Sequence, residues 1–228
     1  MPEQRSTTTP RGRGGRPQRP RRTDELTGRA QIIEAAVASI LEVGFYRSST
    51  NEIARRANVS WGALQYHFGT REALMLAVLE DGARRFVELV EGARIEGGTV
   101  AERLGQLLDT LSLHYGRPEY LAYLQVLLNM GHDPLTSAEV HKTMQEVAER
   151  SSAHVRRLLR EALGPAARAP DLANTVFLTL RGFALSGQLL DTMGYDMVPP
   201  QSDRVARLRR LLAHILAPYV EQAVQEKS

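Results

Sequence analysis

Residues 48–74 read SSTNEIARRANVSWGALQYHFGTREAL, and this stretch decides the fold. Ser49 followed by Glu52 has the form of a capping box, in which the serine hydroxyl accepts a backbone N–H and the glutamate reaches back. Asn58 tolerates the left-handed conformation of a tight turn, and Ser60 is a favoured N-cap. We therefore predict two short helices joined by a three-residue turn. Such a pair presents a recognition helix to the major groove of DNA.

The sequence on both sides of this stretch is helical as well. Apolar residues recur at helical spacing from Thr27 to Gly44, and Thr70 caps a long helix that we expect to end near Gly97 and Gly98. Further helices are predicted over 100–115, 119–130, 136–163, 171–193 and 203–224. No segment shows a convincing strand pattern. The prediction is an all-α protein of about nine helices, with a three-helix DNA-binding domain followed by a six-helix ligand-binding and dimerisation domain.

Positive charge is concentrated in the N-terminal part of the chain. Residues 1–72 hold 12 Lys/Arg against 7 Asp/Glu, whereas residues 73–228 hold 17 against 19, which together give the net charge of +3. We expect residues 1–22, which hold seven arginines, to be a disordered tail. Residues 23–72 form the predicted helix-turn-helix domain and residues 73–228 the second domain. The tail either assists DNA binding through the minor groove or only solubilises the chain.

Several classes of protein are disfavoured by what the chain lacks. It has no cysteine, which excludes disulfides and thiolate metal sites, and it has no apolar run long enough to span a membrane. We therefore expect a cytoplasmic protein. There is no Gly-rich phosphate loop or nucleophile elbow, and the six histidines are scattered apart from His132 beside Asp133. We expect no enzyme activity, no cofactor and no metal site.

The stretch from Ser48 to Leu74 resembles the signature of the TetR family of bacterial transcription regulators, with a likeness that covers about residues 29–76. The resemblance implies phosphate contacts at the start of the first short helix and around the end of the second, and base contacts on the second. A Gln amide can pair with two edges of adenine, which makes Gln65 the best candidate base reader. Trp61, Ala63 and Gln65 depart from the usual family residues, so the operator sequence cannot be inferred from the operators of relatives. Trp61 either contacts DNA or packs against the protein core. The DNA-binding candidates are Ser49, Thr50, Asn51, Trp61, Gly62, Ala63, Gln65, Tyr66, His67 and Arg71.

The last two predicted helices each carry an apolar seam that needs another helix. The seam is either part of an intramolecular core or, as the family resemblance implies, the interface of a homodimer built as a four-helix bundle. A two-fold dimer predicts a palindromic binding site. The candidate interface residues are Val176, Leu180, Phe183, Gly187, Leu190, Leu208, Leu212, Ile215 and Tyr219.

Polar and aromatic residues of the middle helices outline a ligand pocket. A few polar groups within Leu-rich walls suit an amphipathic or aromatic small molecule. The candidates are His114, Tyr115, Tyr120, Tyr123, Gln125, Asn129, Arg181 and Gln188. The resulting hypothesis is a repressor that a small-molecule effector releases from a palindromic operator on double-stranded DNA. The alternative is a non-specific architectural DNA-binding protein without a ligand.

Overall fold

The computed structural model describes residues 22–193 and 202–225, with side chains described over 28–186 and 205–225. Within these ranges the chain forms nine α-helices and no strand, which confirms the all-α prediction. The helices are α1 Arg22–Val43, α2 Thr50–Arg56, α3 Trp61–Phe68, α4 Arg71–Glu91, α5 Val100–Tyr115, α6 Pro118–His132, α7 Ala138–Leu163, α8 Pro170–Met193 and α9 Ser202–Gln225. A short 3-10 helix, η1 Gly164–Arg168, was not predicted. In these ranges no helix is long and apolar enough to cross a membrane. The predicted arginine-rich tail lies outside the described residues, apart from Arg22.

The turn between α2 and α3 forms as predicted. Asn58 has a φ of 52°, the left-handed conformation that the tight turn requires. Ser60 caps α3, because its hydroxyl accepts a hydrogen bond from the Ala63 N–H at 3.1 Å. The core of this N-terminal unit (α1–α3) includes the fully buried Ile53 and Leu64. The N-terminal unit therefore follows from local capping and from apolar side chains that face one another.

The predicted capping box at Ser49 is only half formed. The Ser49 hydroxyl accepts the Glu52 N–H at 3.2 Å, as predicted. The Glu52 carboxylate, however, does not reach back, because it binds the guanidinium groups of Arg55 and Arg56 at 2.8 and 2.6 Å. Arg56 also binds Glu42 of α1 at 2.5 Å. The competing arginines therefore draw Glu52 away from the cap, and Arg56 links α2 to α1.

The long helix α4 ends at Glu91, earlier than the predicted end near Gly97 and Gly98. The chain beyond it is held by α7 instead. Arg157 donates hydrogen bonds to the carbonyls of Val90 and Ala93 at 2.5 and 2.9 Å, and the Ile95 N–H donates to the Glu161 carboxylate at 3.0 Å. These contacts with α7 satisfy backbone groups that a longer helix would have paired internally.

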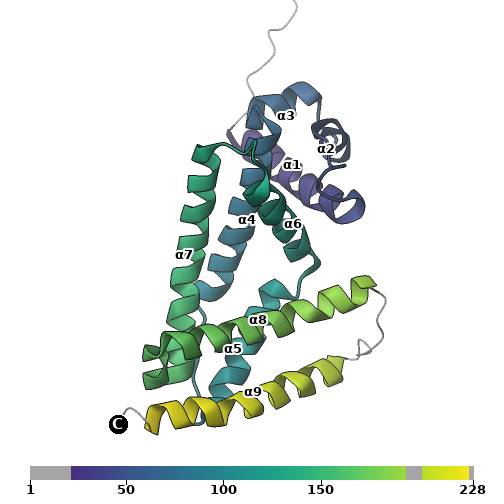
Figure 1. Cartoon of the computed structure of the whole chain (residues 1–228). Coiled ribbons are helices and arrows are strands. Elements are labelled where there is room, and N and C mark those ends of the chain that lie inside the picture. The colour runs from purple at the N-terminus through teal and green to yellow at the C-terminus, as the bar shows by residue number, and fades with distance from the viewer. Residues whose placement is uncertain (1–21, 194–201, 226–228) are drawn as a thin grey trace, which may run out of the picture.

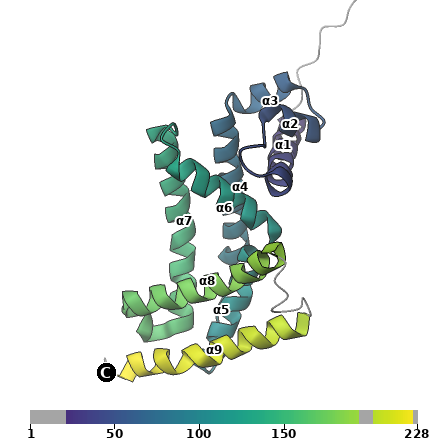
Figure 2. The same ribbon diagram turned by 45° about the vertical axis from the view of Figure 1, so that its right-hand side comes forward.

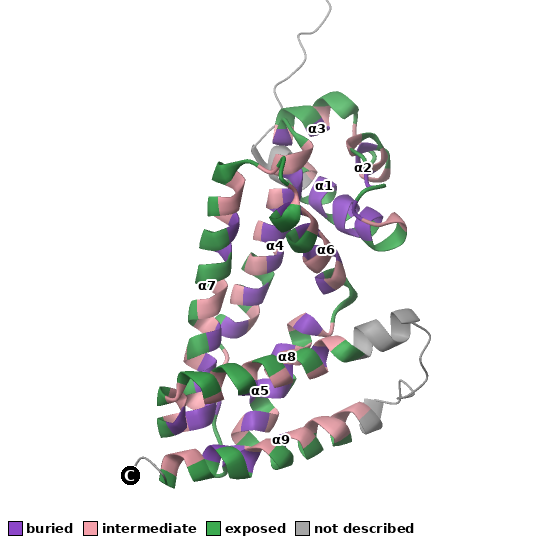
Figure 3. Ribbon diagram, in the orientation of Figure 1, coloured by how far each residue is buried: buried purple, intermediate pink, exposed green. Residues whose placement is uncertain are grey.

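The helices place the N-terminal unit at one end of the molecule and α8 and α9 across the other (Figures 1 and 2). α4 runs from α3 toward α5 and packs against α6 and α7, while α6 also packs against α1. α5 lies against α7, α8 and α9. Buried residues line the inward faces of these helices (Figure 3), and one apolar cluster extends from Ile32 in α1 to Val220 in α9. The arrangement connects the N-terminal unit directly to the middle helices.

Candidate DNA-binding surface and effector cavity

The exposed face of α3 carries most of the predicted base-reading residues. Trp61 exposes 55% of its surface and Tyr66 exposes 72%, so neither belongs to the core. Gly62 and Gln65 are exposed on the same short helix, and Ala63 is half-buried. The Gln65 side-chain amide donates a hydrogen bond to the Gly69 carbonyl at the end of α3. A bidentate contact with adenine would therefore require the Gln65 amide to give up its hydrogen bond with the Gly69 carbonyl.

The start of α2 has the form of a phosphate-binding helix end. Ser49 and Asn51 are exposed, and Thr50 is half-exposed at the first position of the helix. The first N–H groups of a helix have no partner within it, and their dipoles favour an anion. The structure thus leaves these three predicted residues at the surface, although a phosphate contact remains a prediction.

His67 and Arg71 make contacts inside the protein that the sequence did not indicate. His67 is half-buried against α1, where a Cβ added at Gly28 would lie 3.3 Å from its Nε2 atom. Arg71 donates to the Phe45 carbonyl at 2.6 Å and to the Ser48 carbonyl at 3.4 Å, and its guanidinium lies 4.3 Å from the centre of the Phe45 ring. Burial lowers the pKa of this guanidinium. Arg71 therefore ties the start of α4 to the α1–α2 connection, whether or not it also meets a phosphate.

A cavity of about 390 Å³ lies among α4, α5, α6, α7 and α8. It is lined by five of the eight predicted ligand-binding residues, which are His114, Tyr115, Tyr120, Tyr123 and Arg181. The side of the cavity that α4 and α7 form was not predicted, because its residues are mostly apolar and resemble ordinary core residues in the sequence. Prominent apolar residues of the lining are Leu79, Phe86, Met144, Val147, Val155 and Phe177.

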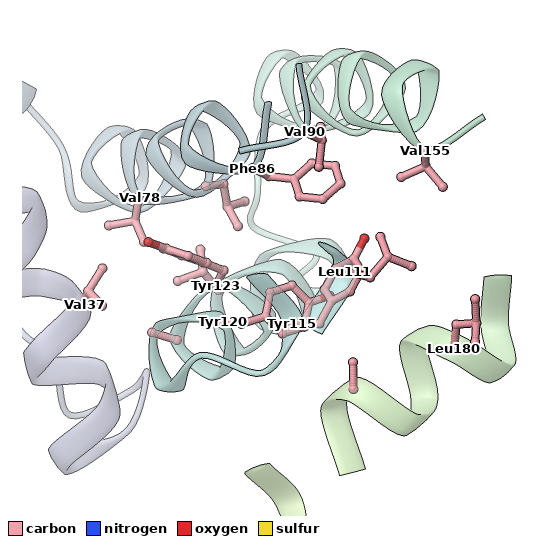
Figure 4. Close-up of a cluster of buried hydrophobic side chains, with 14 of the residues drawn as sticks. Val37, Val78, Phe86, Val90, Leu111, Tyr115, Tyr120, Tyr123, Val155 and Leu180 are labelled. Atoms are coloured by element: carbon pink, nitrogen blue, oxygen red, sulfur yellow. The ribbon is translucent and has the colours of Figure 1, made fainter. Parts of the chain in front are cut away.

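The aromatic residues of the cavity pack against one another. Figure 4 shows Phe86 from α4 near the tyrosines from α5 and α6. The His114 ring lies 4.8 Å from Phe86 and 5.2 Å from Tyr120, measured between ring centres. Burial, followed by the charges of Arg117 and Arg181, lowers the pKa of His114 to about 4, so this histidine is neutral at pH 7.

Arg181 projects from α8 into this aromatic cluster. It donates a hydrogen bond to the Tyr120 hydroxyl, and its guanidinium carbon lies 5.2 Å from the centre of the Tyr115 ring. Burial raises the pKa of Tyr115, so its hydroxyl stays protonated near pH 7. The wall of the cavity thus presents a cation and neutral hydrogen-bonding groups.

A second cavity, also of about 390 Å³, lies beside His114, Tyr120 and Tyr123, which line both cavities. Its lining contains two arginines, Arg85 and Arg117, and two glutamates, Glu88 and Glu119, so positive and negative charges are equal in number. The second cavity therefore differs from the first in holding carboxylates.

The remaining predicted pocket residues do not line the first cavity. The Gln125 side-chain oxygen accepts the Phe45 N–H at 3.1 Å, which joins α6 to the α1–α2 connection. The Asn129 amide donates to the Gln125 carbonyl of its own helix at 2.7 Å. Both residues lie away from the cavity because α6 carries polar residues on two faces, and helical spacing alone does not say which face meets it. The side chain of Gln188 lies outside the described residues.

Comparison with known proteins identifies the N-terminal part. Residues 32–78 match the family model described as bacterial regulatory proteins, tetR family. The fatty acid metabolism regulator protein of Bacillus subtilis (strain 168) is 31% identical over 79 residues, which are 35% of this chain and 41% of that protein. The N-terminal part of the chain is therefore that of a regulatory protein of the TetR family. The first curated relatives are matched over less than half of their own length.

Solved structures are similar in fold over most of the chain. A member from Streptomyces coelicolor A3 has a TM-score of 0.61 at 22% identity, and the match covers 84% of this chain and 98% of that one. The transcriptional regulator FadR from Bacillus subtilis, solved in complex with stearoyl-CoA, has a TM-score of 0.58 at 19% identity and covers 82% and 97%. The TetR-family model spans all the predicted DNA-binding positions from Ser49 to Arg71.

The predicted dimer seam is divided between the core and the surface of the chain. Val176 and Leu180 are buried within the chain itself, which places them in its core and not on a free surface. Phe183, Leu208 and Leu212 are half-buried, and the side chains of Gly187 and Leu190 lie outside the described residues. Ile215 and Tyr219 remain exposed, at 53% and 65%. Leu178 and Leu211, which were not predicted, are also exposed apolar residues of α8 and α9.

Proposed function

We propose that the protein is a sequence-specific DNA-binding transcriptional regulator, a repressor that a small-molecule effector releases from a palindromic operator. The observation that carries the proposal is the direct connection between an exposed helix α3 and a cavity in the middle helices. Residues 23–72 would bind DNA and residues 73–228 would bind the effector and a second copy of the chain. The arginine-rich residues 1–22 would strengthen binding by adding phosphate or minor-groove contacts.

The connection runs through α4 and α6. Arg71 at the start of α4 holds the α1–α2 connection, and Gln125 of α6 holds the same segment at Phe45. Farther along α4, a Cβ added at Gly82 would lie 2.9 Å from the Tyr123 ring, so the two helices are in close contact where they line the cavity. A molecule in the cavity would touch both helices and would therefore shift the N-terminal unit.

Exposed apolar residues on α8 and α9 support a dimer. Leu178, Leu211, Ile215 and Tyr219 expose more than half of their surfaces, which favours a face that a second copy covers. Two-fold symmetry would place two α3 helices on one face of the dimer at a fixed spacing, which DNA accepts only at matching half-sites. A shift of the N-terminal units would change that spacing. An effector that favours the non-binding state about 100-fold would weaken operator binding by up to a similar factor, or about 2.7 kcal/mol.

The family resemblance and the named relatives are consistent with this proposal. FadR from Bacillus subtilis was solved with stearoyl-CoA, which shows that a protein of this fold can hold an acyl compound. The rival function is a non-specific architectural DNA-binding protein. The cavity beside α4 and α6 favours the regulator, because an architectural protein has no use for an effector site.

Selection of binding sites from random DNA tests the proposal. The full-length protein is expected to enrich an inverted repeat with one half-site spacing, and the purified protein should prefer that site over unrelated DNA by about 10³-fold or more. Enrichment of no sequence, together with equal affinity for all duplexes, would favour the architectural protein instead.

A further inference from the structure

The charged groups that line the first cavity are all basic. Among its lining residues are Arg156 and Arg181, together with His114, but no aspartate or glutamate. The second cavity, by contrast, holds two glutamates with its two arginines. The absence of a carboxylate therefore belongs to the first cavity and not to the middle helices in general.

The two arginines of the first cavity differ in their partners. Arg156 binds the carboxylate of Glu149 at 2.5 Å, so its charge is compensated within α7. Arg181 is half-buried, and its hydrogen-bond partner is the neutral hydroxyl of Tyr120. In the described part of the chain no carboxylate forms an ion pair with Arg181. A half-buried guanidinium without a counter-charge is costly, and an incoming anion would reduce that cost.

The groups around Arg181 favour an anion further. Tyr115 and Tyr120 flank the guanidinium at 5.2 and 5.8 Å from their ring centres. A phenol hydroxyl can donate a hydrogen bond to a carboxylate. His114 is neutral at pH 7 and brings no negative charge. This end of the cavity thus combines a cation with neutral donors.

The other side of the cavity is mainly apolar, although Ser151 and Ser152 of α7 and Asn174 of α8 also line it. Its apolar lining comes from Leu79 and Phe86 of α4, Val147 and Val155 of α7, and Phe177 of α8. The volume of about 390 Å³ lies at the small end of the range for drug-sized ligands, roughly 300–1,000 Å³. A single acidic group on a short hydrophobic body would match this distribution of charge and apolar surface.

We propose that the effector is an anionic amphiphile, with its acidic head at Arg181 between Tyr115 and Tyr120 and its apolar body between α4 and α7. This inference rests on the proposed function, since it assigns a chemical class to the molecule that the cavity would bind. A guanidinium can hold a carboxylate through two parallel hydrogen bonds, which gives the site preference for acids over neutral or cationic molecules of the same shape.

A displacement experiment with matched probes tests the charge preference. The neutral fluorophore N-phenyl-1-naphthylamine reports occupancy of the cavity in the full-length protein, and decanoate, 1-decanol and decylamine then compete for it at pH 7.5. Decanoate is expected to bind at least about tenfold more tightly than 1-decanol, and decylamine more weakly than either. Equal affinities for decanoate and 1-decanol would overturn the inference without touching the proposed function.

Two variants locate the charge that is responsible. Arg181→Gln is expected to lower decanoate affinity at least about tenfold while leaving the affinities of 1-decanol and the fluorophore nearly unchanged. Arg156→Gln is the matched control, because it removes a guanidinium of the same cavity that Glu149 already compensates. Retained fluorophore binding shows that each variant is folded. An equal loss of decanoate affinity in both variants would overturn the role of Arg181.

The failure of the proposed function has a different signature. If the fluorophore does not bind, or if bound decanoate leaves the affinity for the selected operator unchanged, the cavity is not an effector site and both proposals fall. If decanol and decanoate both displace the fluorophore and weaken operator binding equally, the proposed regulatory function is supported and only the preference for an anion is wrong.

Discussion

Gln125→Met tests whether α6 holds the N-terminal unit in place. The side-chain oxygen of Gln125 accepts a hydrogen bond from the Phe45 N–H, and Phe45 is only 5% exposed. Methionine has nearly the same length and shape as glutamine but cannot accept this hydrogen bond. The substitution therefore leaves the Phe45 N–H without its partner and changes little else.

The expected cost follows from the burial of that N–H group. An unsatisfied buried donor costs roughly 1–3 kcal/mol, and a domain of about 150–250 residues loses roughly 2–4 °C of Tm per kcal/mol. Thermal unfolding should thus show a drop of several degrees. Operator affinity should change as well, because α6 no longer fixes the α1–α2 connection. Binding of a fluorophore in the cavity should stay the same, because Gln125 does not line it.

Asn129→Ala is the matched control on the same helix. Its amide contacts only the Gln125 carbonyl within α6, so we expect a loss below about 0.5 kcal/mol and no effect on operator binding. The reasoning would be refuted if Gln125→Met kept full stability and operator affinity but weakened binding in the cavity. That result would restore Gln125 as a ligand-binding residue.

Three further predictions concern DNA binding, assembly and pH. Gln65→Ala should change the preferred base at one position of the selected site. Arg71→Ala should lower the affinity for all sequences and also reduce stability, because the Arg71 side chain anchors the α1–α2 connection. A changed base preference in Arg71→Ala alone would reverse the two roles. Ile215→Asp should give a monomer by analytical ultracentrifugation, while the control Leu135→Asp, at a leucine that is even more exposed, should not. A dimer that persists at micromolar concentration would place the interface elsewhere. The pKa of His114 is lowered from 6.5 to about 4 in the folded chain, so the unfolded chain takes up this proton first and stability is lost as the pH falls from 6.5 toward 4. Between pH 7 and pH 5 the wild type should therefore lose about 2 kcal/mol more than His114→Gln in urea unfolding, and equal losses would contradict a neutral buried histidine.

Local sequence signals determined the helices and the helix-turn-helix. Ser60 and Thr70 cap α3 and α4 as the sequence predicted, and Asn58 adopts the left-handed turn. These features could be predicted because each depends on groups within three or four residues along the chain. The exception at Glu52 has the same physical cause, since Arg55 and Arg56 lie just as close and carry the stronger attraction.

Only the tertiary structure decided which way each helix face points. Helical spacing placed Val176 and Ile215 in the same kind of seam, but packing within the chain buries Val176 and leaves Ile215 exposed. In the same way it turned Gln125 toward Phe45 and Arg181 toward Tyr120. The partners in these contacts lie 80 and 61 residues apart along the chain, and a pattern with a period of 3.6 residues carries no information about such distant neighbours. The sequence by itself therefore determined the helices and the likeness of residues 32–78 to the TetR family, whereas the cavity, its uncompensated cation and its connection to α1 arise from how those helices pack.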